Sequence, residues 1–349
     1  MFSGNTIDTT RIWGENSISL MINAFQMAYP GFPTTSVSWK PNAITIAPMN
    51  AFGFAFTAAS LVHDPNKAPV LLVPETLTTE LRSEIQRLSP SGKGVPAQTF
   101  LIGPVSQQVE RDLRSMGLTT LRIGNHSPYD TSVAVSKFRL DFPPASEQGR
   151  KNLFILSGER FTESMFVPNY AMHQGLPVLL TMKQELPRAV QQFLLQHKGM
   201  NVYIVGSTET VSASVENEIR RTTEGKVTRI TGSSPYDLSV HFSTFFDPDT
   251  QVGWNRNKKG RGDAFSFVAT TEWHHAIISG LFSHLGKHAP LLVTTHDALP
   301  EAVRRYLHAM RPEMRKPQPP FMHGFVFGNF ASISYQTQVE IEESIILQM

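Results

Sequence analysis

The chain has 349 residues, of which 40% are hydrophobic and 17% are charged, a length that suits three ordinary domains and a composition typical of a globular protein. The net charge is only +2 and is spread evenly along the sequence, which argues against nucleic acid as a partner. Cysteine is absent, so disulfides, zinc–thiolate sites and thiol nucleophiles are excluded.

The first half of the chain raises the question of secretion and membrane insertion. The segment Met1–Asn5 has neither a basic nor an apolar region, so the sequence predicts no signal peptide at this start. The stretch Pro41–His63 contains no Asp, Glu, Lys or Arg. Because it includes Asn42 and Asn50, we predict a buried strand followed by a buried helix rather than a membrane span.

The same landmarks recur three times along the chain, about 110 residues apart. Each copy opens with an arginine and an isoleucine: Arg11-Ile12, Arg122-Ile123 and Arg229-Ile230. Each continues with an apolar strand led by proline: Pro69–Leu72, Pro177–Leu180 and Pro290–Val293. Each then has an aromatic-led strand that ends in glycine: Phe100–Gly103, Tyr203–Gly206 and Phe325–Gly328.

A serine and a Val-Glu pair complete the repeated pattern. They are Ser106 with Val109-Glu110, Ser207 with Val215-Glu216, and Ser332 with Val339-Glu340. A shared order of landmarks is improbable by chance, so the sequence predicts three modules with the bounds 1–118, 119–226 and 227–349. Triplication is a way to gain avidity or to build a closed three-fold assembly, and a poor way to build one catalytic pocket.

The second copy shows the predicted secondary structure most clearly. Its apolar runs predict strands at 121–123, 153–156, 177–181 and 202–205, and its amphipathic runs predict helices at 129–138, 163–173, 186–196 and 212–221. This alternation is typical of parallel βαβ units with helices on both faces of each sheet. Linkers between copies are short, so we expect the modules to pack as one rigid body.

The repeats resemble the cell wall binding repeat family, type 2, which occurs as tandem triplets on Gram-positive surface proteins. The resemblance covers the chain from about Thr10 to Glu343. It implies an α/β fold of three tandem Toprim-like modules with parallel sheets, packed with pseudo-three-fold symmetry. It also implies non-covalent attachment to an anionic cell wall polysaccharide or teichoic-acid-like polymer, and an extracellular, wall-associated location.

The family's motif residues can be placed on this sequence, and they supply the candidate ligand contacts. The matching positions are the opening Arg11, Arg122 and Arg229, the tyrosines Tyr129 and Tyr236, and the strand-leading Pro69, Pro177 and Pro290. The arginine that precedes the tyrosine in the family is replaced by Ser17, Pro128 and Pro235. The acidic position of the second helix is occupied by Phe54, Glu163 and His275.

Two of these patterns have a structural alternative. The opening arginines either contact an anion or bridge to a carboxylate of the neighbouring module, and we favour the bridge because repeated charges often fix repeat interfaces. The Ser-Pro-Tyr-Asp segments at 127–130 and 234–237 either hold an anion or cap a helix. We favour capping, because serine caps a helix whose first turn contains Pro and Asp.

Other candidate sites are weaker. His284 and His288 have the i, i+4 spacing of metal ligands, but no carboxylate accompanies them, so we predict no metal site. The basic loop Arg256–Arg261, which runs into an Arg-Gly-Asp tripeptide, is expected to be a solvated loop that offers at most an electrostatic contact. The chain has no Gly-x-Ser-x-Gly, phosphate-loop or His-Glu-x-x-His motif, so we predict no catalytic residues, no cofactor and no enzyme activity.

Two functional hypotheses follow. The first is a binding protein that attaches to an anionic wall polymer through three weak sites acting with avidity. The second is a structural or protein-docking unit that has kept the fold and lost polymer binding. The 23 phenylalanines favour protein partners in the second case.

Overall fold

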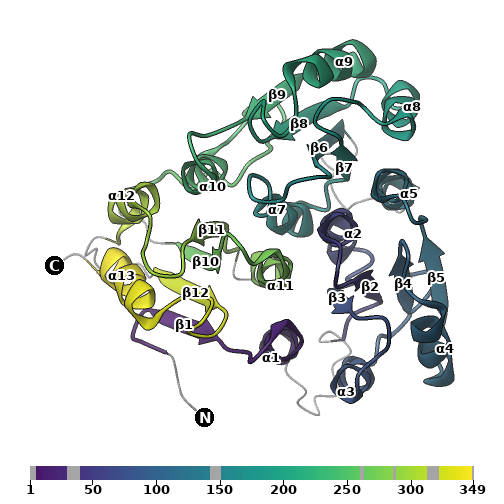
Figure 1. The fold of residues 1–349 in the computed structure, drawn as a ribbon, viewed down its shortest axis with the longest axis horizontal. Coiled ribbons are helices and arrows are strands. Elements are labelled where there is room, and N and C mark those ends of the chain that lie inside the picture. Colours follow the sequence, from purple (N-terminus) through teal and green to yellow (C-terminus); the bar gives the residue numbers. More distant parts are fainter. Residues whose placement is uncertain are drawn as a thin grey trace.

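The computed structural model describes residues 5–29, 40–141, 151–259, 263–285, 288–312 and 322–347. These residues form three separate four-stranded sheets, and every pairing within them is parallel. Figure 1 shows the three sheets set around a centre that is occupied by helices α2 (Phe52–Ala58), α7 (Val167–Gln174) and α11 (Trp273–His284). The predicted α/β fold of repeated modules with parallel sheets is therefore confirmed.

The three sheets have the same strand order. The first is β3 (Val70–Val73), β2 (Ile44–Pro48), β4 (Thr99–Ile102), β5 (Thr120–Ile123). The second is β7 (Val178–Thr181), β6 (Asn152–Ser157), β8 (Asn201–Val205), β9 (Val227–Ile230). The third is β11 (Leu291–Thr294), β10 (Ala264–Ala269), β12 (His323–Phe327), β1 (Thr9–Ile12). Most inner-strand residues are buried, as expected for sheets covered on both faces.

The strand that opens each repeat completes the sheet of the preceding repeat. Arg122 of β5 pairs with Leu101 of the first sheet, and Arg229 of β9 pairs with Ile204 of the second. The first copy has no predecessor, so its strand β1 closes onto the third sheet, where Arg11 pairs with Val326. The two ends of the chain are thereby joined in one sheet, and the three modules form a closed set.

The helix that follows each opening strand packs against the sheet of its own repeat, not against the preceding sheet that the strand completes. Helix α5 (Pro128–Asp141) lies against β7, and α10 (Pro235–Thr244) lies against β11. The hydroxyl of Ser132 accepts a hydrogen bond from the Leu180 amide (3.2 Å). The sheets thus run across the predicted boundaries at 118/119 and 226/227, and the division into three modules stays a prediction about sequence units.

The remaining helices repeat in the same order in each copy. They are α1 (Ser17–Ala28), α3 (Thr79–Leu88), α4 (Gln107–Ser115), α8 (Arg188–Gln196), α9 (Ala213–Thr223), α12 (Glu301–Met310) and α13 (Tyr335–Ile345). All eight elements predicted for the second copy are present. The helix predicted from 163 begins only at Val167, because Pro168 fits the first turn of a helix and Glu163 is used elsewhere.

The charge-free stretch before His63 forms strand β2, helix α2 and a 3₁₀ turn (Ala59–Val62), and β2 is buried at all five positions. The prediction of a buried strand and a buried helix is confirmed. Across the ranges that the structure covers, none of the helices is both long and apolar enough to span a bilayer.

The central helices join the modules through aromatic and polar contacts. Phe52 of α2 lies with ring centroids 5.6 Å from Phe161 and 6.4 Å from Trp273. Asn169 of α7 donates a hydrogen bond to Ser279 of α11 (2.9 Å), and both residues are fully buried. One hydrophobic core cluster runs through all three copies, which fixes the strand ends of the three sheets relative to one another.

Candidate functional site

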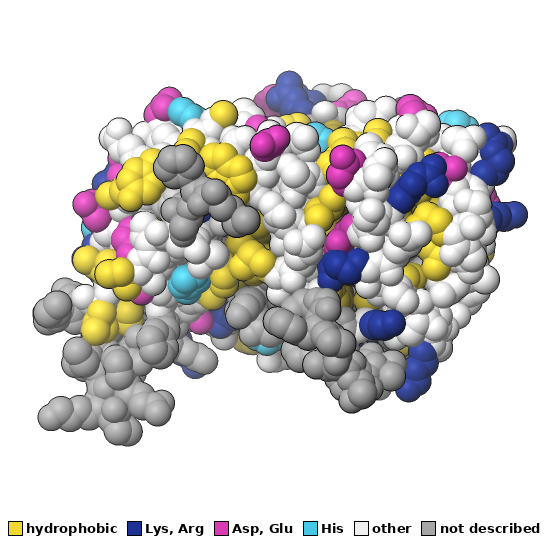
Figure 2. Space-filling view, turned by 90° about the horizontal axis from the view of Figure 1, so that it is seen from below, with side chains coloured by type: hydrophobic (Ala, Val, Ile, Leu, Met, Phe, Trp, Pro, Cys, Tyr) yellow, Lys and Arg dark blue, Asp and Glu magenta, His cyan; other side chains and the backbone are white. Residues whose placement is uncertain are grey.

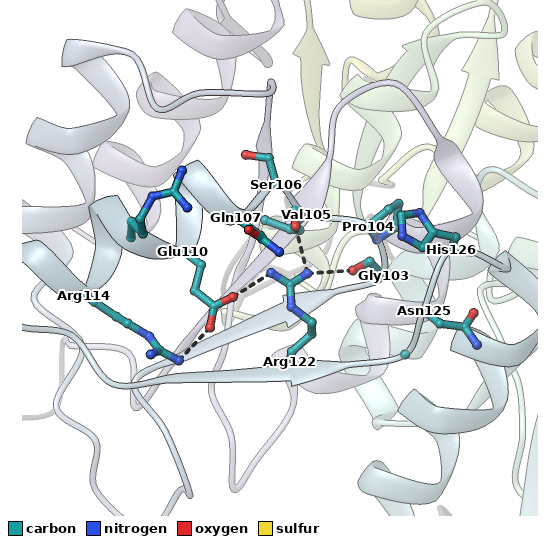
Figure 3. A pocket seen from close by; sticks show the side chains of 12 residues that line it. Gly103, Pro104, Val105, Ser106, Gln107, Glu110, Arg114, Arg122, Asn125 and His126 are labelled. Atoms are coloured by element: carbon teal, nitrogen blue, oxygen red, sulfur yellow. Dashed lines mark hydrogen bonds and ion pairs between the residues drawn. The ribbon is translucent and has the colours of Figure 1, made fainter.

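The opening arginines mark three equivalent positions at the carboxyl ends of the sheets. In the first, the Arg122 guanidinium donates to the carbonyls of Gly103 (3.2 Å) and Val105 (2.8 Å) and to the carboxylate of Glu110 (2.7 Å). Figure 3 shows this guanidinium between the Glu110 carboxylate and the turn that follows β4. Arg122 therefore ties the fourth strand to the loop and helix α4 of the preceding copy.

The second position repeats this arrangement. Arg229 donates to the carbonyls of Gly206 and Val211 (2.8 Å each) and to the carboxylate of Glu216 (2.7 Å). In both positions the carboxylate belongs to the preceding copy. The bridging role that we favoured from the sequence is thus confirmed for Arg122 and Arg229, while a role in ligand binding stays a prediction.

The third position keeps the arginine and loses the carboxylate. Arg11 donates to the carbonyl of Gly328 (3.0 Å) and to the side-chain oxygen of Gln338 (2.8 Å). Its guanidinium carbon lies 4.6 Å from the ring centroid of Phe330, a cation–π geometry. Burial lowers the pKa of Arg11 to about 10, so the side chain is still charged at neutral pH. All of its described partners are neutral groups.

The three positions share a serine that caps the helix after the loop. The hydroxyl groups of Ser106, Ser212 and Ser334 accept from the amides of Val109, Val215 and Thr337. The residue four positions after each cap faces the arginine, and these residues are Glu110, Glu216 and Gln338.

Our choice of landmarks was consequently wrong at three places. Ser207 and Ser332 are not the capping serines of the second and third copies, because the loops before the caps differ in length. Glu340 is not the third equivalent of Glu110: it lies two residues further along and pairs with Arg304 (2.9 Å). The cap followed four residues later by Glu or Gln is the signal that identifies the true equivalents.

The position assigned to the family's acidic residue lies directly behind each strand-ending glycine. Glu163 accepts from the amide of Ser207 (2.6 Å) and from the hydroxyl of Thr210 (2.9 Å). A Cβ atom on Gly103 would fall 2.4 Å from the ring of Phe54, and one on Gly328 would fall 3.2 Å from His275. The three residues therefore occupy one equivalent place. Burial lowers the pKa of His275 to about 4, so this site holds a neutral imidazole.

An open groove of about 670 Å³ lies beside Arg122. It is lined by the turn after β4, the outer face of α4 and the loop after β5, including Arg111, Arg114, Glu110 and His126. The hydrogen bond from Arg122 is the main cause that lowers the pKa of Glu110, so this carboxylate is ionised at neutral pH. Three guanidinium groups against one carboxylate make the groove a net cationic surface.

The tyrosines and prolines of the motif pack against or within the protein core. Tyr129 packs on Gly158, where an added Cβ would lie 2.6 Å from its ring, and Tyr236 is partly buried against the core. The capping prediction is confirmed, because Ser127 and Ser234 accept from the amides three residues on (3.2 and 3.1 Å).

The three strand-leading prolines, Pro69, Pro177 and Pro290, are buried, and their carbonyls accept hydrogen bonds from the neighbouring strands. These contacts give the prolines a structural role, and their role as ligand contacts stays a prediction.

His284 and His288 do not form an i, i+4 pair on one helix, because α11 ends at His284. His284 lies against His63, with ring centroids 5.1 Å apart, and His288 lies against His173 at 4.9 Å. Among the described residues no group of three or more His, Asp or Glu side chains is placed to hold a metal ion. In the basic loop Arg256 pairs with Asp263 (3.0 Å), and Arg261 and Gly262 lie outside the described residues.

Comparison with known proteins supports the resemblance drawn from the repeats. Residues 122–216 match the model of the family Cell wall binding domain 2 (CWB2), so the resemblance is confirmed on the second copy. The amidase enhancer of Bacillus subtilis (strain 168) is 26% identical over 314 residues, which are 88% of this chain and 38% of that protein. The N-acetylmuramoyl-L-alanine amidase LytC of the same organism is 26% identical over 198 residues, 55% of this chain and 36% of that protein.

Two solved structures share the fold. Cwp8 from Clostridium difficile superposes with a TM-score of 0.74 over 98% of this chain and 52% of its own, at 18% identity. Cwp6 from the same organism gives a TM-score of 0.76 over 97% of this chain and 48% of its own, at 16% identity. The chain thus spans about half the length of these structures and less than two fifths of the two Bacillus proteins.

Proposed function

We propose that this chain is a non-catalytic attachment unit that binds non-covalently to an anionic polymer of the Gram-positive cell wall, outside the cell. The family match and the names of the two Bacillus proteins support an association with the wall. Three Toprim-like modules related by pseudo-three-fold symmetry fit the three sheets of identical strand order. Three weak sites on one rigid body give avidity without any single strong site.

The observation that carries this proposal is the cationic groove beside Arg122. Arg111 and Arg114 line it from the exposed face of α4, and Arg114 shares Glu110 with Arg122. A phosphate or uronate of a polymer meets exposed guanidinium groups there, at fixed positions and with little desolvation cost. Arg122 itself contributes only its positive charge to the groove, since its N–H donors are already held by protein acceptors.

The test is co-sedimentation of the purified chain with Gram-positive walls, native and stripped of anionic polymer. We expect sedimentation with native walls only, and release on addition of about 0.5 M salt, because exposed charges are screened at that ionic strength. Equal sedimentation with both wall preparations, or binding that is insensitive to salt, would contradict the electrostatic mechanism.

A docking unit for protein partners is the second candidate. It is favoured by one observation: the guanidinium of Arg229 is only 13% exposed and is held by Glu216 and two carbonyls, so it is satisfied without a ligand. In this case the chain fails to sediment with either wall preparation, and it is recovered in a complex with a defined protein.

A further inference from the structure

Among the residues that the structure describes, aromatic rings gather at one of the three equivalent strand ends and not at the other two. Trp13 follows β1, Phe330 lies in the loop after β12, and Tyr335 is the first residue of α13. The ring centroids of Trp13 and Phe330 are 5.0 Å apart at 76°, and those of Phe330 and Tyr335 are 5.9 Å apart at 86°. Phe330 is thus the middle ring, and its two neighbours meet it edge to face. We call these three residues the aromatic platform.

The platform is accessible to solvent. Tyr335 is 53% exposed, and Trp13 and Phe330 are partly exposed. On the face seen in Figure 2, Lys and Arg side chains gather on the right, on the side of α3 and α4, whereas the left, on the side of the chain ends, shows exposed apolar side chains and few Lys or Arg. With three partly exposed rings and only neutral partners described for Arg11, the third strand end is an apolar counterpart of the first, where two further arginines line the groove.

The fold itself does not require aromatic residues at these places. The residue after the opening Arg-Ile pair is Trp13 in the third site, Gly124 in the first and Thr231 in the second. The residue after the capping serine is Tyr335, Gln107 or Ala213, and Phe330 corresponds to Thr208 of the second site. Because the second module makes a turn of the same length between its strand-ending glycine and its capping serine without these rings, the rings serve something other than packing.

The rings are held in place from behind. The side-chain amide of Asn329 donates to the carbonyl of Gly14 (3.1 Å), and an imidazole nitrogen of His296 bonds the Phe330 carbonyl (3.0 Å). Arg11 covers one face of the Phe330 ring at 4.6 Å. A surface that is already ordered binds a ligand at a smaller entropic cost.

From this geometry we propose that the aromatic platform is a stacking site for a pyranose ring of the wall polymer. This proposal rests on the function proposed above and deepens it. A pyranose ring presents an apolar face of C–H groups and a rim of hydroxyls. Aromatic faces bind the first, because their π-electrons carry partial negative charge and their area is apolar.

The size of the patch favours a sugar ring over a protein partner. Among the described residues of the third sheet and its helices, the other exposed large apolar side chains are Ile7, Leu285 and Ile346. Ile7 precedes β1, and Leu285 and Ile346 follow the ends of α11 and α13, so they lie at the opposite ends of the strands, where Glu342 accepts a hydrogen bond from the amide of Asp8 (3.0 Å). They do not extend the platform. Three rings cover the area of one or two sugar residues and much less than the interface that a stable protein complex needs.

The experiment replaces the rings with residues that another module carries at the same place. Trp13→Thr and Phe330→Thr copy the second site, and Tyr335→Gln copies the first. Ile346→Thr is the matched control, since it removes an exposed apolar side chain at the other end of the sheet. Affinity for soluble wall polymer is measured by calorimetry at low and at high salt, and folding is followed by thermal unfolding.

We expect the Trp13→Thr/Tyr335→Gln variant to bind about tenfold more weakly, by the same factor at both salt concentrations, with unfolding unchanged. Tyr335→Phe keeps the ring and retains affinity. Equal affinities of the variant and the wild type, a loss that disappears in high salt, or a change in oligomeric state would each overturn the proposal. If the wild type itself does not bind wall polymer, the proposed function fails first, and that outcome is distinct from a failure of the platform.

Discussion

The first and third strand ends show what one scaffold position keeps and what it varies. In both, an arginine from the fourth strand donates to the carbonyl of the strand-ending glycine. The first adds Glu110 and two further arginines around an open groove, whereas the third has Gln338 and three aromatic rings. The contact between the arginine and the glycine carbonyl, which we call the inner contact, is structural and recurs. The exposed side chains around it, which we call the rim, differ in charge and polarity. Recognition is therefore expected to reside in the rim.

The largest expected effect concerns the stability of the central helices, which hold both strand ends in place. Each copy has one histidine at the C-terminal end of its central helical segment. They are His63, after the 3₁₀ turn that follows α2, His173 of α7 and His284 of α11, and His288 lies beside His173. Burial is the first cause that lowers the pKa of His173 to about 3 and of His284 to about 4; the neighbouring imidazoles and Arg256 add to it for His173, and His63 and Lys67 for His284, where Asp64 opposes it. His63 is shifted in the same direction.

In the unfolded chain these histidines take up a proton near pH 6.5. The unfolded state therefore binds more protons below this pH, and stability that is fully present at pH 7 is lost as the pH falls. We expect a loss of a few kcal/mol in the free energy of unfolding between pH 7 and pH 4. Denaturation curves at pH 7, 6 and 5 check this, because few carboxylates titrate in that window. A His284→Gln variant should flatten the dependence, and the exposed His126→Gln should not.

The second prediction separates the inner contact from the rim. Arg11 is 6% exposed, whereas the Arg122 side chain is 34% exposed. Arg11→Ala leaves the Gly328 carbonyl and the Gln338 oxygen without their donor inside the protein, so we expect a loss of about 3 kcal/mol in stability. Arg122→Ala should cost about 1 kcal/mol, because water replaces the lost donor.

Urea denaturation measures both losses, with the exposed Arg221→Ala on α9 as the control. Equal losses for Arg11 and Arg122 would break the distinction between a buried and an accessible strand end. A loss of wall binding at full stability would instead show that the arginine contacts the ligand directly.

The third prediction tests the cationic rim. Arg111→Gln/Arg114→Gln removes two charges that line the groove while the bond from Arg122 to Glu110 remains. We expect polymer affinity to fall by roughly tenfold at low salt and the difference to vanish at about 0.5 M salt. Arg188→Gln/Arg221→Gln makes the same change of charge on exposed faces of the second copy and is expected to leave affinity unchanged.

The repeated pattern predicted the order and bounds of the elements well, because buried strands and amphipathic helices are local features. It did not reveal that β5, β9 and β1 cross over to the preceding sheet, because strand pairing across a boundary leaves no trace in local periodicity. It aligned Glu340 with Glu110, because a Val-Glu dipeptide is short enough to recur by chance, here two residues beyond the true equivalent Gln338. Nor did it find the aromatic platform, in which Trp13 lies more than 300 positions from Phe330 and Tyr335 along the chain.

The smallest expected effect comes from exchanging the one residue that most distinguishes the two strand ends. Glu110→Gln makes the first site like the third: Arg114 and Arg122 lose their shared carboxylate, so stability should fall by about 1 kcal/mol while the groove gains one positive charge. Polymer affinity at low salt should therefore rise about two- to threefold.

Gln338→Glu makes the reverse change beside Arg11. Because the guanidinium of Arg11 balances the new carboxylate, the stability of the protein should change by less than about 1 kcal/mol. If both exchanges weaken polymer binding equally, the carboxyl groups themselves contact the polymer, and the rim cannot be described by its net charge alone.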